Sequence, residues 1–255
     1  MIKKALILFA SALCLVSCDF RHSEENNLMT VFGTIQGNKD KGYTIYRDGG
    51  GIITPITSSV TSAAGEETEI TKLSSRAVLY ISYLSENIKD LGNDTFNLDG
   101  VHVQGGVIMP VVKPMTLEEA AKAKVTVADS VFKVNRFSGI WGYRGYMTTI
   151  INANVFRGSG AKTPSFNLIY NPEQNKENEL DLTLVYNRHC SQEAEVSGSV
   201  DFYFSYDISS LAKLPAGRDS VKINVNIAGA ETQTFKIGRE DFSASNYVPF
   251  SGKTK

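Results

Sequence analysis

Apolar and polar residues alternate with a period of two along much of this chain. The alternation is clearest at residues 201–206 (DFYFSY) and 222–227 (KINVNI). Successive side chains of a β-strand point to opposite faces, so this period predicts antiparallel sheet with one buried face. Residues 77–84 (AVLYISYL) are instead apolar, β-branched or aromatic almost throughout, which indicates a buried strand.

Turn signals divide the first half of the chain into short strands. Residues 31–35 and 43–46 flank the loop GNKDKG, and this arrangement predicts a hairpin. The run DGGG at residues 48–51 predicts a second turn, and residues 96–112 predict one long strand or two short ones. Residues 58–75, rich in Ser, Thr, Ala and Glu, predict a mobile loop.

One helix signal separates the two halves of the chain. Thr116 and Glu119 form a capping box, in which the Thr hydroxyl accepts from the third helical amide and the Glu side chain reaches back. We expect a short helix from there to about Lys124, with Pro114 separating it from the preceding strand. The boundary between two domains is therefore placed here.

The second half of the chain is strongly β in character. Seven candidate strands lie at residues 131–134, 147–156, 165–170, 179–186, 199–206, 221–227 and 232–237. Short strands separated by turns in this number predict a seven-stranded antiparallel β-sandwich. Residues 141–146 (WGYRGY) are predicted to form a glycine-rich turn.

The first residues of the chain have the pattern of a bacterial lipoprotein signal. Lys3 and Lys4 precede an apolar run at residues 5–16, and Leu-Val-Ser then leads to Cys18. The run is too short to span a bilayer, which needs roughly 20 apolar residues, so it predicts a processed signal peptide. We expect cleavage before Cys18 and lipid attachment to its thiol, which would hold the protein on a membrane.

The segment after the signal and the overall charge bound the location and the partners. Residues 18–29 are largely polar and predict a flexible tether. We expect a cell-envelope protein anchored to the outer membrane, on its periplasmic or surface face. Loss of Lys3 and Lys4 with the signal leaves 24 basic against 27 acidic residues, a net charge near −3. Because phosphate binding requires clustered cations, nucleic acid is not expected as a partner.

Several motifs, in order, give the chain its resemblance to a known family. They are the lipobox ending at Cys18, the DG turn within residues 43–51, the helix entry KPMTLEE at 113–119, the Asp-Ser pair at 129–130, the WGY turn within 141–146, and RDSVKI at 218–223. In this order and spacing, the chain resembles the NigD-like lipoproteins of Bacteroidetes. The serine-rich insert at residues 58–75 is longer than that family's pattern.

The resemblance implies an all-β fold in which a small OB-like β-barrel precedes the β-sandwich, with one short linking helix. The expected organisation is a signal peptide at residues 1–17, a tether at 18–29, an OB-like β domain at 30–112, a linking helix at 113–127, a β-sandwich at 128–240 and a tail at 241–255. It implies architecture and envelope location, and no established molecular activity.

Aromatic residues provide two candidate binding surfaces. The candidate patch is Trp141, Tyr143 and Tyr146, since aromatic rings beside glycines can stack on sugar faces. The alternative is that Trp141 packs against the edge of the sandwich. The rings of the barrel either offer a stacking face, as in many OB folds, or fill its core. These rings are Phe32, Tyr43, Tyr46, Tyr80 and Tyr83.

The titratable and nucleophilic residues give no enzymatic or metal-binding pattern. His22, His102 and His189 have no ligand spacing, so neither a metal nor a cofactor is predicted. His189 and Cys190 are adjacent, and adjacent strand residues point to opposite faces, which argues against a nucleophile–base pair. Cys190 is also the lone cysteine beyond Cys18, so no disulfide is expected.

Two short motifs suggest a covalent modification. Asp129-Ser130-Val131 and Asp219-Ser220-Val221 fit an Asp-Ser/Thr-apolar acceptor pattern similar to that of O-glycosylation in Bacteroidetes. Ser130 and Ser220 are therefore candidate glycosylation sites, and the alternative is that each simply begins a strand.

The function predicted from the sequence is that of a lipid-anchored, non-enzymatic envelope protein that binds a protein or a glycan. One alternative is a lipoprotein that protects against a bacteriocin, which rests on the name of the resembling family. A second alternative is a hydrolase whose site is not recognisable in sequence.

Overall fold

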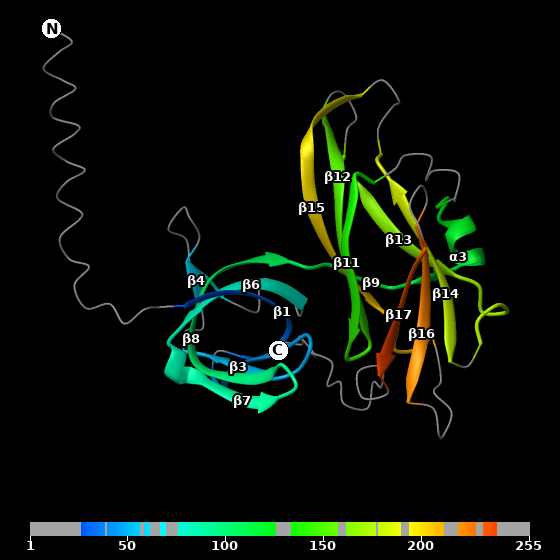
Figure 1. Cartoon of the computed structure of the whole chain (residues 1–255). Helices are drawn as coiled ribbons and strands as arrows, with labels where there is room; N and C mark the ends of the chain where they lie inside the picture. Colours follow the sequence, from blue (N-terminus) through cyan, green and yellow to red (C-terminus); the bar gives the residue numbers. More distant parts are fainter. Residues whose placement is uncertain are drawn as a thin grey trace, which may run out of the picture.

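The computed structural model describes residues 27–38, 40–56, 59–61, 67–69, 76–125, 134–157, 162–176, 178–189, 194–211, 219–227 and 232–238. These residues form a β-barrel from the first half of the chain and a β-sandwich from the second half, which lie side by side (Figure 1). The predicted all-β class, with an OB-like barrel followed by a sandwich, is confirmed. Cys18, Ser130 and Cys190 lie outside the described residues.

The sheet of the first half closes into a barrel, because the strands at the two ends of a five-stranded order pair with each other. Its strands are β1 (Asn27–Asn38), β2 (Gly42–Arg47), β3 (Ile52–Pro55), β6 (Arg76–Tyr83), β7 (Ile88–Gly92) and β8 (Thr95–Ile108), with the 3-10 turn η1 (Ser85–Asn87). The order β3-β2-β1-β6-β8 closes through parallel pairing of β3 with β8. This is the strand order of an OB fold, and β7 extends the sheet beyond β8.

Glycine permits the tight turn between β2 and β3. All three glycines of the predicted DGGG turn have positive φ angles. At Gly51 a Cβ atom would lie 1.9 Å from the carbonyl oxygen of Phe96 on β8. Only glycine allows the chain to pass this close to β8 and to begin β3 in register for closure.

The predicted serine-rich loop contains a small separate hairpin. β4 (Ser59–Thr61) and β5 (Glu67–Glu69) pair antiparallel as a two-stranded sheet. The rest of residues 58–75 lies outside the described part of the chain.

The sandwich consists of a five-stranded and a four-stranded sheet. The first contains β10 (Met115–Thr116), β13 (Ser165–Tyr170), β14 (Glu179–Asn187), β16 (Ser220–Ile227) and β17 (Gln233–Gly238), and the second β11 (Arg136–Tyr143), β12 (Tyr146–Arg157), β15 (Glu195–Asp207) and β9 (Val111–Val112). Three pairs are parallel, namely β14 with β16, β10 with β13, and β15 with β9. The sandwich differs from the seven-stranded antiparallel pattern expected in two ways. Short linker segments (β9 and β10) and the edge strand β11 add to the count, and β14 lies parallel to β16 because the chain crosses to the other sheet as β15 between them.

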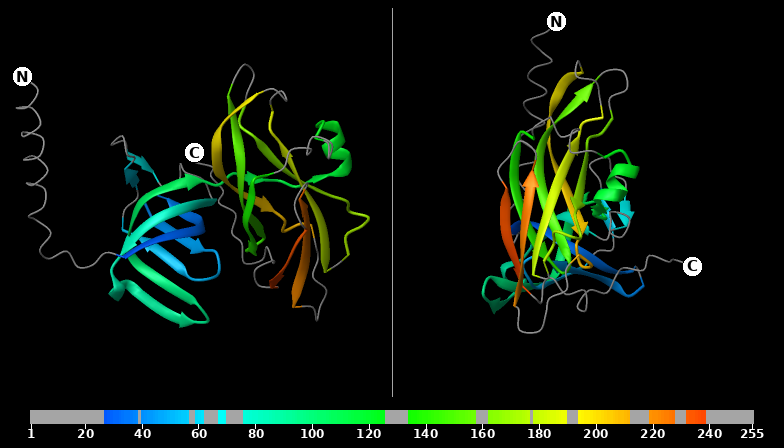
Figure 2. Two further views of the ribbon diagram at one scale, coloured as in Figure 1. Left: turned by 45° about the horizontal axis from the view of Figure 1, so that its top comes forward. Right: turned by 90° about the vertical axis from the view of Figure 1, so that its right-hand side faces the viewer.

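The segment that links the domains contributes to both sheets of the sandwich. β9 joins the four-stranded sheet, β10 joins the five-stranded one, and α3 (Leu117–Lys122) follows. The predicted capping box is present: the Glu119 N–H donates to Thr116 Oγ1 over 3.2 Å, and the Thr116 N–H donates to Glu119 Oε2 over 2.8 Å. Ala120 packs on Ile169 and Val185, so the helix covers the outside of the sandwich on the side away from the barrel (Figure 2).

Each domain has its own apolar core. The barrel core is built from inward-facing aliphatic side chains together with Tyr43 and Tyr83. The larger core of the sandwich includes a cluster of rings, with Phe166 at 5.0–5.3 Å from Tyr186, Phe202 and Phe204. Among the described residues, no helix is both long and apolar enough to cross a membrane.

Candidate binding site at the seam of the two domains

A buried arginine joins the barrel to the sandwich. Arg76 begins β6, and its side chain is 0% exposed. Its Nη1 and Nη2 atoms each donate to one carboxylate oxygen of Asp48 over 2.6 Å. Nη1 also donates to Thr34 over 3.1 Å, Nη2 to Thr148 over 2.7 Å, and Nε to Ser205 over 3.1 Å. A guanidinium has five N–H donors, and these contacts use all of them.

The partners of Arg76 come from both domains. Asp48 and Thr34 belong to the barrel, whereas Thr148 lies on β12 and Ser205 on β15 of the sandwich. A buried charge is tolerated only when it is paired and hydrogen-bonded, and the planar guanidinium satisfies these partners in a single geometry. The ion pair therefore fixes how the two domains sit against each other.

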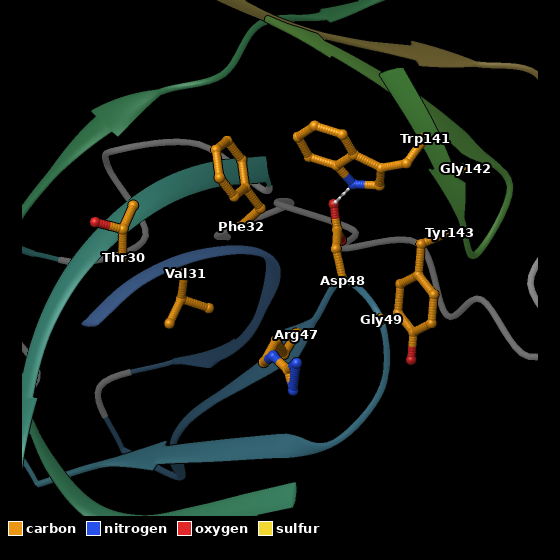
Figure 3. Close-up of a pocket in the computed structure, with 9 residues that line it drawn as sticks. All are labelled: Thr30, Val31, Phe32, Arg47, Asp48, Gly49, Trp141, Gly142 and Tyr143. Atoms are coloured by element: carbon orange, nitrogen blue, oxygen red, sulfur yellow. Dashed lines mark hydrogen bonds between the residues drawn. The ribbon is translucent and has the colours of Figure 1, made fainter. Parts of the chain in front are cut away.

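The carboxylate of Asp48 also holds the single tryptophan of the chain. The indole N–H of Trp141 donates to Asp48 Oδ2 over 2.8 Å, as Figure 3 shows. The Trp141 ring packs edge-on to Phe32, with ring centroids 4.9 Å apart, and lies over Gly139. Trp141 thus packs across the seam against the barrel, rather than against the edge of its own sandwich.

The glycine-rich segment around Trp141 is a strand followed by a tight turn. Residues 136–143 form β11, an edge strand absent from the predicted set, and Arg144 and Gly145 make the two-residue turn with φ angles of 50° and 79°. Positive φ at both positions is the requirement of a type I′ hairpin. A Cβ atom at Gly142 would lie 1.9 Å from Ile237 Cδ1, so glycine lets β11 approach β17 closely.

A recess opens beside Trp141, between the barrel and the sandwich (Figure 3). Its volume is about 390 Å³. Its lining comes from β1, the end of β2 and the turn after it, and β11. The lining residues are Thr30, Val31, Phe32, Arg47, Asp48, Gly49, Trp141, Gly142 and Tyr143. We call this cavity the seam recess.

The charged groups of the seam recess are already engaged within the protein. Asp48 is bound by Arg76 and Trp141. Arg47 donates from Nη1 to the carbonyl of Gly50 over 3.2 Å and from Nη2 to that of Asp94 over 3.4 Å. The Arg47 guanidinium also lies 4.0 Å above the ring of Phe96. The recess therefore offers aromatic surface together with the positive charge of Arg47, which its carbonyl partners hydrogen-bond but do not neutralise.

The structure brings two of the three predicted patch residues together. Trp141 and Tyr143 line the seam recess, whereas Tyr146 is 4% exposed and lies under Arg76, 5.0 Å from its guanidinium. Of the barrel rings, Tyr43 and Tyr83 are buried in the core and Tyr80 is 42% exposed. Phe32 lies under Trp141, and Tyr46 lies beneath the guanidinium of Arg144 at 4.3 Å.

The remaining predicted sites lie apart from this recess. Ser220 is the first residue of β16 and pairs with Gly238 at a half-buried position, so its modification stays a prediction. His189 Nε2 lies 2.7 Å from Ser165 Oγ at the end of the sandwich. Across the described ranges, no three His, Cys, Asp or Glu side chains converge to hold a metal ion.

Sequence reasoning missed the residues that make the seam. Arg76 stands before an otherwise apolar strand, and Asp48 stands before three glycines that indicated only a turn. The available signal was the lone arginine at the start of a strand predicted to be buried, because a buried arginine requires a carboxylate partner.

These features define a two-domain, all-β protein in which an OB-like barrel is fixed against a β-sandwich. Residues 113–238 match the family described as NigD-like C-terminal beta sandwich domain, and the match begins at the Lys-Pro pair that opens the helix entry. The sandwich therefore belongs to the NigD-like family, and the resemblance stated from the sequence is confirmed. No curated protein sequence matches the chain significantly.

Several solved structures from Bacteroides are similar to this chain at low sequence identity. A protein of unknown function from Bacteroides vulgatus ATCC 8482 has 16% identity and a TM-score of 0.55, over 83% of this chain and 90% of that one. A candidate lipoprotein from Bacteroides fragilis NCTC 9343 has 12% identity and a TM-score of 0.51, over 83% and 97%. A NigD-like immunity protein from Bacteroides caccae ATCC 43185 has 15% identity and a TM-score of 0.48, over 86% and 100%. At these identities, the two likenesses with a TM-score above 0.5 are likenesses of fold alone.

Proposed function

We propose that this protein is a lipid-anchored envelope protein that binds a partner, without catalysis, at the seam recess. The observation that carries the proposal is a cavity of about 390 Å³ with walls from two domains that a buried ion pair holds in place. A site of this kind binds without first ordering its walls, which removes one of the main costs of association.

The chemistry of the recess favours binding over catalysis. Asp48 is the single carboxylate among the nine lining residues, and its oxygens accept from Arg76 and Trp141. General acid–base hydrolysis of a glycoside needs two carboxyl groups on opposite sides of the bond that breaks. The aromatic residues Phe32, Trp141 and Tyr143 instead supply contact area, which is typical of recognition sites.

A photo-crosslinking amino acid tests the proposed site in intact cells. Benzoylphenylalanine is placed at Tyr143, in the recess, and as a control at Leu91, which is 50% exposed on β7. Illumination is expected to give a discrete adduct from position 143 and none from position 91. Equal labelling at both positions, or none at either, would mean that the recess is not the binding site.

Membrane attachment is proposed from the lipobox and is tested separately. Cells are fed radiolabelled palmitate, and the chain is compared with a Cys18→Ala variant. Radiolabel is expected in the parent chain and not in the Cys18→Ala variant. Protease treatment of intact cells, followed by blotting for the sandwich, then distinguishes the surface from the periplasmic face.

A further inference from the structure

The first half of β1 has a strand partner on one side only. Residues 27–34 pair with β6, but pairing with β2 begins at Gly33. Backbone groups point to alternate sides along an antiparallel strand. The carbonyl of Phe32 accepts from the Asp48 N–H over 2.8 Å, on the side away from β6. The backbone N–H and C=O groups of the even-numbered residues of β1 therefore point away from β6. Thr30 and Leu28 continue this series.

The backbone of Thr30 and Leu28 is thus available on the open side of the strand. Within the described part of the chain, β1 has no neighbour on this side before Phe32. Leu28 is 79% exposed, and Thr30 is exposed as well. Two N–H and two C=O groups consequently lie along a free edge, and such an edge is a template for another strand.

This free edge runs into the seam recess. Thr30, Val31 and Phe32 form one wall of the recess, with Trp141 and Tyr143 on the other (Figure 3). A second recess of about 360 Å³ adjoins it at Thr30 and is lined by Leu28, Met29, Thr30, Tyr80, Ile81 and Gln104. An extended peptide on the open side of β1 would point alternate side chains to opposite faces, and those on the outer face would lie next to the seam recess. The second recess lies over β1, β6 and β8, on the other side of the strand.

The chemistry of the edge selects its occupant. Alternating N–H and C=O groups at the strand repeat are matched by another peptide backbone, and sugars have no such repeat. The carboxylate of Asp48 is neutralised by Arg76, and Arg47, which keeps its positive charge, already donates to the carbonyls of Gly50 and Asp94. The hollows beside the edge are largely apolar or aromatic, which suits uncharged side chains.

We infer that the partner of the seam recess is a protein that adds an extended segment to the free edge of β1, pairing with Leu28 and Thr30 and placing an apolar side chain against Trp141 and Tyr143. This inference rests on the proposed function, because it names the class of ligand for the same recess. It is the recognition mode called β-strand addition, in which main-chain bonds give affinity and side-chain pockets give specificity.

Two substitutions at Thr30 separate main-chain pairing from side-chain contact. Thr30→Pro removes the N–H on the open side, which the barrel does not use, and its ring obstructs an incoming strand. Thr30→Val keeps the N–H and the β-branched shape. Circular dichroism and the emission of Trp141 verify that both full-length, detergent-solubilised variants are folded as the parent chain is.

The binding probes are random dodecapeptides displayed on phage and selected on the parent chain, alongside a panel of neutral hexasaccharides. We expect selected peptides to bind Thr30→Val within about twofold of the parent and Thr30→Pro at least about tenfold more weakly, from the lost bond and the obstruction. We also expect bound peptide to slow amide hydrogen exchange at Leu28 and Thr30. A Leu91→Ala chain, altered on the distant β7, should bind as the parent does.

The outcomes separate this inference from the proposed function. Peptides that bind Thr30→Pro as well as the parent would overturn strand addition and leave the recess as a side-chain site. Hexasaccharides that bind and change Trp141 emission, with no peptide selected, would overturn the protein partner and retain the recess. Failure of both probe sets, together with no adduct at position 143, would remove both proposals.

Discussion

Replacement of Asp48 by alanine is the most direct test of how the two domains are joined. The substitution removes the two carboxylate oxygens that accept from the Arg76 guanidinium, at 2.6 Å each, and with them the acceptor of the Trp141 indole. The side chain of Asp48 is 4% exposed and that of Arg76 is 0% exposed, so water has little access to replace the lost bonds. The variant therefore retains a buried and uncompensated positive charge.

The size of the effect follows from that burial. Breaking a buried ion pair by removing one partner costs about 3–5 kcal/mol, whereas an exposed pair contributes about 0–1 kcal/mol. In a domain of 150–250 residues each kcal/mol lowers Tm by about 2–4 °C, so we expect a fall of about 6–20 °C. An exposed carboxylate of the same barrel, Asp99, serves as the matched control, and Asp99→Ala should change stability by about 0.5 kcal/mol or less.

Calorimetry and urea unfolding followed by Trp141 emission measure the stability of Asp48→Ala and Asp99→Ala, and also of the four chains of a double-mutant cycle. The cycle contains the parent, Asp48→Leu, Arg76→Met and the double variant. We expect the apolar pair to be more stable than either single variant, with a coupling energy above about 1 kcal/mol. The reasoning is refuted if Asp48→Ala lies within about 1 kcal/mol of the parent, or if the effects of Asp48→Leu and Arg76→Met simply add.

Three further predictions concern single positions elsewhere in the structure. Gly142→Ala, whose added Cβ would overlap Ile237, should destabilise the sandwich by about 1–3 kcal/mol in urea unfolding, and an unchanged midpoint would contradict this packing. Thr116→Ala should cost about 1 kcal/mol by loss of the helix cap, and Thr116→Ser should retain most of that stability. The ammonium of Lys222, with further hydrogen bonds, lowers the pKa of Glu179 from 4.5 to about 2. The ionised carboxylate thus stabilises the fold fully above pH 4.5, and the stability difference from Glu179→Gln should vanish as the pH falls toward 2. An NMR titration midpoint near pH 4.5 for Glu179 would contradict the lowered pKa.

The elements that the sequence predicted best are those determined by local chemistry. The cap at Thr116 and Glu119 depends on residues three positions apart, and the turn of residues 48–51 depends on its glycines. Each can therefore be predicted from a few consecutive residues. The strand at residues 76–83 was likewise predictable from its apolar run. Its buried arginine was not, because the partners of Arg76 lie 28 to 129 positions away.

The segment around Trp141 shows the opposite case. Three glycines in WGYRGY and the residues before it indicated a turn, yet residues 136–143 form an edge strand. Gly139 makes room for the indole and Gly142 makes room for Ile237, so two of these glycines serve packing across strands and only Gly145 serves the turn. Composition alone does not separate these uses, because each depends on a neighbour far along the chain. The aromatic residues that the sandwich contributes to the recess were therefore predictable. The barrel residues that form the opposite wall were not.

The form of the seam bears on why the recess is suited to binding. A well-packed apolar contact would join two domains as strongly as a buried ion pair, since desolvation offsets much of the attraction between the charges. Such an apolar contact would also tolerate small changes in the angle between the two domains. The five N–H donors of Arg76, by contrast, are all satisfied only when Thr34, Thr148 and Ser205 hold their positions. The same ion pair positions Asp48, and Asp48 in turn fixes Trp141. The distance between the free edge of β1 and the ring of Trp141 is thus determined by one buried charge. A substitution at Arg76 should therefore lower the affinity of the recess for any ligand, even though Arg76 does not line the recess.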